Sequence, residues 1–403
     1  MKRVVITGIG IISSIGNNKK EVLQSLKLGK SGISFSKEMF NLGMKSNVIG
    51  NINIKKFGKI DNKIFRFMNM SSVYSYFSFL EAVKDSKLNL NIYQKNYRVG
   101  LISGSGNVSY EFNDFSKRML KKYNKIDPYF SIKNFPSNIS ACLSTFFKIY
   151  GITYSISSAC TTSSHCICNA FDLIKYGKQD IIFAGGAEEI NFKLANSFDV
   201  MKVLSRKRND FPKKSSRAFD EDRDGFVISG GSGFLVLEEL NFAISRNANI
   251  YAEIINYSCL SNGKSMILPS KDRSAKCMEK AINGTKIDYI NAHATSTKIG
   301  DHIEYNAILK VFKKYNYIPI ISSTKSMTGH SLGASGVHEI IYTILMMKNN
   351  FIAPSINIKK LDTRFKINNI AYKKINRKIY TAMSNNFGFG GTNVSIIIKN
   401  FIL

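Results

Sequence analysis

The sequence predicts an α/β fold with a largely parallel sheet, and two observations support this prediction. Short β-branched runs, from VVIT near the N-terminus to VSIIIK near the C-terminus, alternate with segments of helical periodicity along the chain. Two long stretches also share one plan of strand, two serines, turn and helix: YSISSACTTSSHCICNAFDLIKYGK and IPIISSTKSMTGHSLGASGVHEIIYTILMMKNN. This likeness indicates a duplication with its break near Asn241 to Asn249, although coincidence between two βα units explains it equally well.

Length and composition limit the class of protein. The chain has 403 residues, 44% of them hydrophobic, which is enough for a large buried core. It contains no run of about 18 apolar residues, so we expect no membrane-spanning helix. The N-terminal run is broken by Gly8 and Gly10 and lacks a small-residue cleavage site, so it does not fit a secretory signal. The cysteines form no spaced disulfide framework, which favours a reducing compartment and a cytoplasmic protein: they are Cys142, Cys160, Cys166, Cys168, Cys259 and Cys277.

The formal net charge of +29 raises the question of nucleic acid. Lysine far outnumbers arginine, although arginine provides the bidentate fork favoured for bases and phosphates. The lysines are also scattered from Lys19 to Lys399 rather than gathered into one groove. We therefore expect no nucleic-acid partner and predict attraction to an acidic partner instead.

Cys160 is the first candidate for chemistry. It stands directly after a strand-like run and directly before a helix whose apolar residues recur at helical spacing. A thiol at a helix N-terminus faces unpaired N–H groups and the positive end of the dipole, which predicts a lowered thiol pKa and a nucleophile. An inert buried cysteine is the alternative, and position alone does not separate the two.

His165, Cys166 and Cys168 lie close by in the same segment and raise the question of a metal site. Residues two apart on a helix point in nearly opposite directions, so Cys166 and Cys168 cannot share one tetrahedral ion. We expect no metal, and both cysteines to pack in the core.

Two of the five histidines fall in loop-like segments. His293 follows the apolar run IDYINA, where a strand ends and a side chain can enter a crevice. His330 lies in TKSMTGHSLGASG beside a helix start, which disfavours imidazolium and predicts a neutral hydrogen-bond donor. Each alone has an equally good structural explanation, but a cysteine and two such histidines together indicate an active site.

Other motifs are explained by structure. Asp301 and Glu304 fit a capping box with Asp301 as the N-cap. The N-terminal GIGIISS is a weak dinucleotide fingerprint, with Ser13 in place of the third glycine, so we expect no cofactor. The glycine-rich NNFGFGGTN is either a tight turn or a set of backbone N–H groups facing an oxyanion.

The motifs SSACTTSSH, INAHATST, TKSMTGHSLGASG, RDGFVISGG and SNNFGFGGTN, in this order, resemble those of β-ketoacyl-acyl carrier protein synthases of the Cys-His-His type. The resemblance covers nearly the whole chain and is closer to synthase I than to synthase II, which stays the alternative. It implies the thiolase fold: two duplicated βαβαβ halves in a five-layered α-β-α-β-α body, and a homodimer. Residues 1–245 would carry the nucleophile, and residues 246–403 the two histidines and a lysine.

The resemblance also implies an activity. Cys160 would hold the acyl chain as a thioester, while His293 and His330 hold the malonyl carbonyl during loss of carbon dioxide, giving a 3-ketoacyl product in fatty acid elongation. The N–H groups of Cys160 and Phe389 would form an oxyanion hole. Lys325 would pair with Glu304 and organise the site electrostatically.

Further residues follow from the same resemblance. Thr295 and Thr297 would bind the pantetheine arm, Phe389 would act as a gate, and Leu194 and Phe198 would form walls of the acyl pocket. Acyl carrier protein is acidic, so a basic docking face is expected from Lys63, Arg66, Lys121, Lys122 and Lys125. Solvated surface lysines are the alternative explanation for each of these.

The sequence departs from the family pattern at two positions. Thr161 stands where alanine is common, and Ala294 stands where glycine is usual, which predicts strain if that backbone needs positive φ. Two rival classes fit less well. A non-catalytic chain-length partner would lack the nucleophile, and a thiolase would have a second cysteine near the C-terminal glycines, whereas none follows Cys277.

Overall fold

The computed structural model describes residues 1–54, 57–107, 127–365 and 369–402. Ten strands form one mixed sheet in the order β10-β9-β13-β14-β8-β1-β7-β6-β4-β5. The first five strands in sequence are β1 Val4–Ile12, β4 Val99–Gly104, β5 Thr153–Ser155, β6 Ile181–Glu188 and β7 Gly231–Glu239. The other five are β8 Ala252–Ser261, β9 Tyr289–Asn291, β10 Ile320–Ser322, β13 Thr381–Gly388 and β14 Thr392–Asn400.

Each half of the sheet repeats one strand order. Numbered within its own half, β5-β4-β6-β7-β1 and β10-β9-β13-β14-β8 both read 3-2-4-5-1. The halves join where Val4–Ile6 of β1 pairs antiparallel with Ala252–Ile254 of β8. This repeated order favours a true duplication over coincidence between two βα units. The division of the chain at residue 245 stays a prediction.

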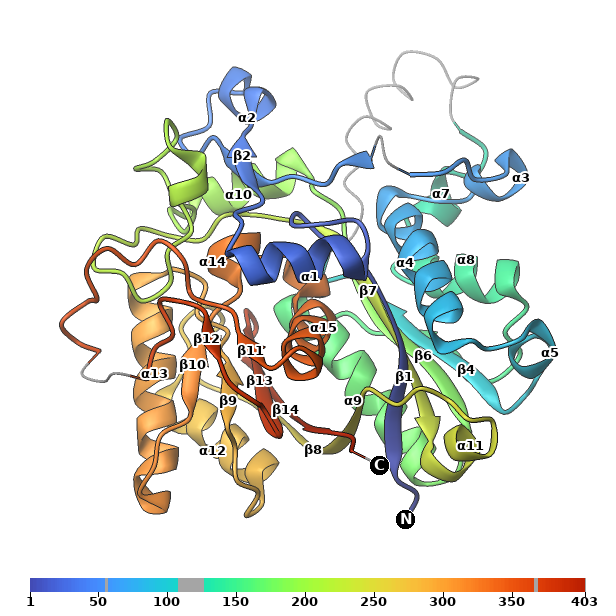
Figure 1. Ribbon diagram of the computed structural model, residues 1–403. Coiled ribbons are helices and arrows are strands. Elements are labelled where there is room, and N and C mark those ends of the chain that lie inside the picture. Colours follow the sequence, from blue (N-terminus) through green and yellow to red (C-terminus); the bar gives the residue numbers. More distant parts are fainter. Residues whose placement is uncertain (55–56, 108–126, 366–368, 403) are drawn as a thin grey trace.

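Helices complete a layered α/β body (Figure 1). Two helices, α9 (Thr162–Lys175) and α15 (Ser335–Lys348), pack against each other between the halves of the sheet. The outer faces are covered by α4 (Met70–Ser86) and α8 (Asn138–Phe147) on one half, and by α12 (Lys271–Ile282) and α13 (Lys298–Phe312) on the other. These are the five α-β-α-β-α layers of the predicted thiolase fold. In the described ranges, no helix combines the length and apolar character needed to cross a bilayer.

Shorter elements join the layers. The helices are α1 Lys19–Leu28, α2 Lys37–Asn41, α3 Asn62–Phe65, α5 Leu90–Tyr93, α7 Phe130–Lys133, α10 Phe192–Val200, α11 Leu240–Ser245 and α14 Lys325–Thr328. The 3-10 turns near the site are η3 Ala159–Thr161 and η6 Leu332–Ala334. The short strands are β2 Ile33–Phe35, β3 Val48–Gly50, β11 Phe351–Ile352 and β12 Ile375–Asn376.

Local sequence explains how two central elements, α15 and β1, pack in the fold. All residues of α15 except Lys348 are buried, which fits its apolar run IIYTILMM. In β1, a Cβ at Gly10 would lie 1.9 Å from the carbonyl oxygen of Ser78, and one at Gly8 would lie 2.5 Å from that of Ala82. The glycines of GIGIISS therefore allow α4 to pack closely on β1.

Candidate active site

Cys160 lies in the 3-10 turn η3, between β5 and the N-terminus of α9. The preceding Ala159 has φ 50°, a left-handed conformation that is uncommon for a residue with a Cβ. Thr161 Oγ1 donates to the carbonyl oxygen of Ser158 at 2.7 Å and accepts from the Thr392 hydroxyl at 2.8 Å, so the non-alanine side chain at this position braces the turn. Cys160 is 9% exposed and lines a cavity of about 450 Å³.

The pKa of the Cys160 thiol is raised, whereas the sequence predicted that it would be lowered. Burial raises the pKa to about 11, and it outweighs the lowering by the Phe389 N–H and by the charge of Lys325. The helix N-terminus is present, but the cost of a buried thiolate is larger than the dipole contribution. The free enzyme therefore holds a protonated thiol, and the proton must leave during attack.

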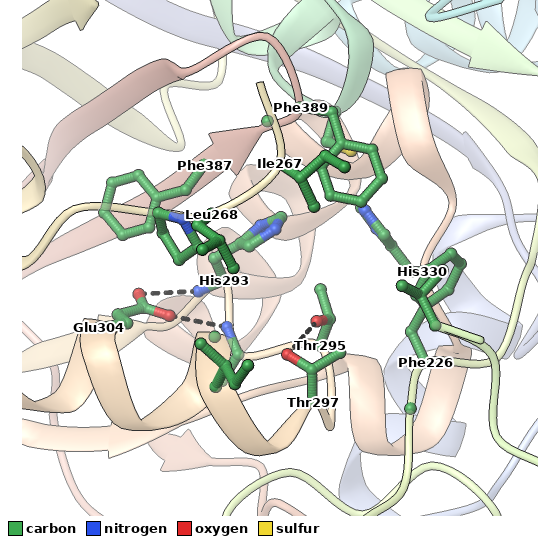
Figure 2. Close-up of a pocket in the computed structure, with 18 of the residues that line it drawn as sticks. Phe226, Ile267, Leu268, His293, Thr295, Thr297, Glu304, His330, Phe387 and Phe389 are labelled. Atoms are coloured by element: carbon green, nitrogen blue, oxygen red, sulfur yellow. Dashed lines mark hydrogen bonds between the residues drawn. The ribbon is translucent and has the colours of Figure 1, made fainter. Parts of the chain in front are cut away.

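His293 and His330 face each other in the same cavity (Figure 2). Their ring centroids are 5.2 Å apart at an angle of 87°. His293 follows β9, and His330 lies between α14 and η6, so two loops of the C-terminal half present both rings. Burial, followed by the positive charge of Lys325, holds both pKa values well below the ordinary range. Both imidazoles are therefore neutral at pH 7, as the sequence predicted for His330.

One nitrogen of His330 is already occupied. The distance from Nδ1 to Ser335 Oγ is 2.9 Å, which leaves Nε2 for a ligand. When the Ser335 hydroxyl donates to Nδ1, the proton of the neutral ring resides on Nε2, which then acts as a donor.

Lys325 pairs with Glu339, not with Glu304 as predicted. The Lys325 ammonium forms a close ion pair with Glu339 Oε1, and both side chains are almost fully buried. Asn386 Nδ2 donates to Glu339 Oε2 at 2.7 Å. The prediction was wrong because helix packing brings Glu339 of α15, a carboxylate in an otherwise apolar run, against Lys325 of α14.

Glu304 instead holds the loop that carries His293. Its carboxylate accepts the N–H of His293 at 3.0 Å and that of Ala294 at 2.7 Å, and Asn385 Nδ2 lies 3.2 Å away. Burial raises the pKa of Glu304 to about 7, and these donors together with Lys325 oppose that rise. Glu304 thus lines the cavity and fixes the backbone of the loop that carries His293.

The predicted capping box does not form. Helix α13 begins at Lys298 with Thr297 as its N-cap, so Asp301 lies inside the first turn. Asp301 Oδ1 accepts the N–H groups of Ser296 and Thr297, and the carboxylate forms an ion pair with Arg223 at 3.3 Å. Asp301 therefore binds the backbone N–H of the N-cap residue and pairs with Arg223, instead of serving as the N-cap itself.

The residue with positive φ in this loop is Ser296, at 74°, rather than Ala294. Ala294 is 1% exposed and has no left-handed backbone. The methyl group of Ala294 therefore causes none of the strain expected for a side chain at a positive φ.

Four of the five residues predicted to contact substrate line the cavity, and Leu194 does not. Thr295 and Thr297 line the cavity with their hydroxyl oxygens 3.3 Å apart (Figure 2). Phe198 and Phe389 also line it, with ring centroids 6.2 Å apart. Leu194 is buried in the apolar cluster that contains Cys160 but is not among the residues that line the cavity.

Gly388 brings the C-terminal glycine-rich loop against the nucleophile. A Cβ at this position would lie 2.7 Å from Thr392 Oγ1 and 3.3 Å from the backbone nitrogen of Cys160. The Phe389 N–H also lowers the pKa of the Cys160 thiol, against the larger effect of burial. This close approach places the two predicted oxyanion donors side by side.

The predicted docking residues are described only in part. Lys63 lies in α3 and is exposed, and the Arg66 guanidinium stacks over Phe67 at 4.9 Å and over Tyr129 at 5.2 Å. Lys121, Lys122 and Lys125 lie outside the described residues.

Glu188, at the end of β6, is a site residue that was not predicted from the sequence. It accepts the N–H groups of Gly333 at 2.9 Å and Gly106 at 3.0 Å, and the Ser105 hydroxyl at 2.9 Å. Burial raises its pKa to about 7. Glu188 thereby ties η6, which follows His330, to the end of β4. The available signal was a charged residue at the end of the apolar run IIFAGGAE, where burial demands partners.

Comparison with known proteins agrees with this fold and site. Residues 1–243 match the family described as "Beta-ketoacyl synthase, N-terminal domain", and residues 251–359 match "Beta-ketoacyl synthase, C-terminal domain". The chain belongs to the β-ketoacyl synthase family.

Individual relatives match over the full length. The chain is 58% identical to the 3-oxoacyl-[acyl-carrier-protein] synthase 1 of Buchnera aphidicola subsp. Acyrthosiphon pisum, covering 100% of both chains. It is 51% identical to the 3-oxoacyl-[acyl-carrier-protein] synthase 1 of Escherichia coli K12, covering 99% of both. A solved β-ketoacyl synthase from Burkholderia phymatum STM815 superposes with a TM-score of 0.92 at 33% identity, covering 100% of both.

Proposed function

We propose that this chain catalyses the decarboxylative condensation of malonyl-acyl carrier protein with an acyl chain held on Cys160, giving 3-ketoacyl-acyl carrier protein in fatty acid elongation. One observation carries the proposal: a thiol and two neutral imidazoles line a single cavity of about 450 Å³. The full-length relatives named 3-oxoacyl-[acyl-carrier-protein] synthase 1 support the same reaction. A non-catalytic chain-length partner is not favoured, because the nucleophile is present and reaches the cavity.

The first step is transfer of the acyl chain. The Cys160 sulfur attacks the thioester carbonyl of acyl-acyl carrier protein, the carbon–sulfur bond to pantetheine breaks, and the departing sulfur takes up the thiol proton. The N–H groups of Cys160 and Phe389 stabilise the oxyanion that forms on the way. Because burial raises the pKa of the Cys160 thiol to about 11, a free thiolate is unfavourable in this site. The proton therefore leaves as the sulfur forms its bond to the carbonyl carbon, so that negative charge does not build up fully on the sulfur.

The second step is loss of carbon dioxide. His293 and His330 donate to the malonyl thioester oxygen while the bond to the carboxylate breaks, and its electron pair forms the enolate. Each well-aimed donor contributes about 3 kcal/mol in a dry site. The enolate carbon then attacks the Cys160 thioester, the 3-ketoacyl product leaves, and Cys160 regains a proton from solvent.

Lys325 acts on the step without touching the reacting atoms. Its charge lowers the pKa of both histidines and of Cys160, so it keeps the imidazoles neutral and favours the thiolate. The Glu339 carboxylate forms an ion pair with the Lys325 ammonium and holds it in place. Glu304 positions the His293 loop through two backbone N–H groups.

The proposal extends to substrate contacts and partners. We assign pantetheine binding to Thr295 and Thr297, gating to Phe389, and the acyl-pocket wall to Phe198, with Leu194 behind it. Acyl carrier protein bearing acyl or malonyl groups is the partner, and Lys63 and Arg66 belong to its docking face. We further propose a homodimer in the cytoplasm; the six free cysteines support a reducing compartment.

The test is a peptide map of the protein after incubation with acyl-acyl carrier protein. We expect one acyl group on Cys160, and 3-ketoacyl product after addition of malonyl-acyl carrier protein. An acyl group on any other residue, or none, contradicts the proposed function.

A further inference from the structure

The hydroxyl of Thr161 joins the two halves of the fold directly beside the nucleophile. Thr161 is fully buried and belongs to the turn of residues 158–161, which presents Cys160. Its Oγ1 donates to the carbonyl oxygen of Ser158 at 2.7 Å and accepts from the Thr392 hydroxyl at 2.8 Å. Ser158 lies in the same turn, whereas Thr392 begins strand β14 in the other half of the sheet. One side chain thus bonds both halves at the same time.

Thr392 closes the hairpin of residues 388–392, which carries Phe389. Strand β13 ends at Gly388, strand β14 begins at Thr392, and these two residues pair with each other. The N–H of Gly391 donates to the carbonyl oxygen of Gly388 at 3.2 Å, which keeps the connection between the strands tight. Because the connection is so short, the position of Thr392 determines where the Phe389 N–H lies.

The nucleophile turn and this hairpin approach each other at Gly388. A Cβ at Gly388 would lie 2.7 Å from Thr392 Oγ1 and 3.3 Å from the backbone nitrogen of Cys160. In the part of the chain that the structure describes, one hydrogen bond between side chains joins the turn to the hairpin, and it is the bond of Thr161 with Thr392. This bond therefore holds the backbone N–H of Cys160 and that of Phe389 at a fixed spacing.

We propose that Thr161 is a positioning residue for acyl transfer, whose hydroxyl holds the two oxyanion donors where a single oxygen can accept from both. The inference rests on the proposed function, in which the N–H groups of Cys160 and Phe389 stabilise the oxyanion of the acyl thioester. Thr161 is not among the residues that line the cavity, so it acts through these backbone groups and not on the substrate. Alanine, which is common at this position in the family, cannot form the bond to Thr392.

A misaligned oxyanion donor has a distinct kinetic signature. The oxyanion exists only during acyl transfer, so misalignment lowers the rate at saturating acyl-acyl carrier protein and leaves the half-saturating concentration unchanged. Complete loss of one donor costs about 10²–10³-fold in rate, and a displaced donor keeps part of its bond, so we expect a loss of about tenfold. Release of carbon dioxide depends on His293 and His330 instead, so its rate should not change.

The experiment measures two reactions of the full-length protein: single-turnover transfer of the acyl chain to Cys160, and release of carbon dioxide from malonyl-acyl carrier protein. Thr161→Val keeps the branched shape without the hydroxyl and should slow the first reaction only. Thr161→Ser keeps the hydroxyl and should retain most of the rate. Thr161→Ala removes the hydroxyl with less bulk and should show the same loss as valine, so the test does not depend on how well valine packs.

Thr392→Val breaks the same bond from its other end. It should slow acyl transfer as Thr161→Val does, and the double variant should lose no more than either single variant, because both remove one interaction. Thr343→Val is the matched control. Thr343 is also fully buried, and its hydroxyl donates to the carbonyl oxygen of Glu339 at 2.7 Å within α15, away from the turn and the hairpin. Its removal should leave acyl transfer unchanged.

Three results overturn the inference: a wild-type rate of acyl transfer in Thr161→Val or Thr161→Ala, equal losses of acyl transfer and carbon dioxide release, or additive losses in the double variant. Each of them leaves the proposed function standing, because the wild-type protein still takes up the acyl chain on Cys160. A wild-type protein that takes up no acyl chain on Cys160 overturns the proposed function and this inference together.

Discussion

The turn that follows β5 and the turn that follows β10 begin alike and end with different chemistry. Both leave the sheet through two serines and lead into one of the two central helices, α9 or α15. The first turn is short and places Cys160 directly at the helix start. The second adds α14 and η6, and this extra length carries Lys325 and His330. The same frame thus occurs twice, and the two turns bring different groups to the cavity, Cys160 from the first and His330 from the second.

The largest expected effect comes from removing the group that only the first turn supplies. Cys160→Ala should reduce condensation to background, because no other described thiol lines the cavity. The control is Cys166→Ala, which removes a fully buried thiol from α9, the helix that follows the Cys160 turn, and should retain acyl transfer. Radiolabelled acyl transfer measures both variants. Substantial acyl transfer to Cys160→Ala would show that another residue accepts the acyl chain, and would contradict the role given to the first turn.

The next effect tests the buried ion pair that Lys325 of the second turn forms with Glu339 of α15. Lys325→Met leaves the Glu339 carboxylate buried without its partner, and we expect a loss of about 3–5 kcal/mol in the free energy of unfolding. Lys325→Met combined with Glu339→Gln should lose less, because no uncompensated charge remains. Urea unfolding of the single and double variants gives the coupling.

Glu304→Gln is the control for this pair. Since Glu304 binds backbone N–H groups and not Lys325, its coupling to Lys325→Met should be much smaller than that of Glu339. Equal coupling at Glu304 and Glu339 would restore the pairing predicted from the sequence.

A comparable effect on stability concerns Glu188, whose carboxylate ties η6 of the second turn to the end of β4. Glu188→Ala leaves two backbone N–H groups and the Ser105 hydroxyl without their acceptor, at about 1–3 kcal/mol for each group that stays unpaired. Glu188→Gln keeps an acceptor and should cost much less. Thermal unfolding compares them, and similar losses in both variants would show that the charge matters more than the hydrogen bonds.

The smallest expected effect is a flat pH response. Because the folded pKa values of His293 and His330 lie well below the ordinary value, both rings stay neutral as the pH falls through 6.5. Malonyl decarboxylation should therefore show no acid limb near pH 6.5, whereas an ordinary histidine would be only about one-quarter neutral at pH 6. Any limb near pH 7 should disappear in Glu188→Gln or Glu304→Gln, since the pKa of each carboxyl is about 7.

Sequence reasoning located the reactive groups better than their partners. Strand ends and helix starts are local features, so Cys160, His293 and His330 could be assigned to loops at the edge of the sheet. The partner of Lys325 depends on how α15 packs against α14, which no local pattern encodes. Asp301 is not the N-cap because α13 begins earlier, at Lys298. The pKa of Cys160 was predicted in the wrong direction because burial, a property of the whole fold, outweighs the lowering by the Phe389 N–H and by the Lys325 charge.

The separate roles of the thiol and the two imidazoles are tested most directly by measuring both half-reactions in His293→Ala and His330→Ala. Release of carbon dioxide from malonyl-acyl carrier protein and transfer of the acyl chain to the protein are followed separately. We predict that each variant loses about 100-fold or more in carbon dioxide release and keeps most of its acyl transfer to Cys160. Equal loss of both half-reactions would contradict the separate roles of the thiol and the imidazoles.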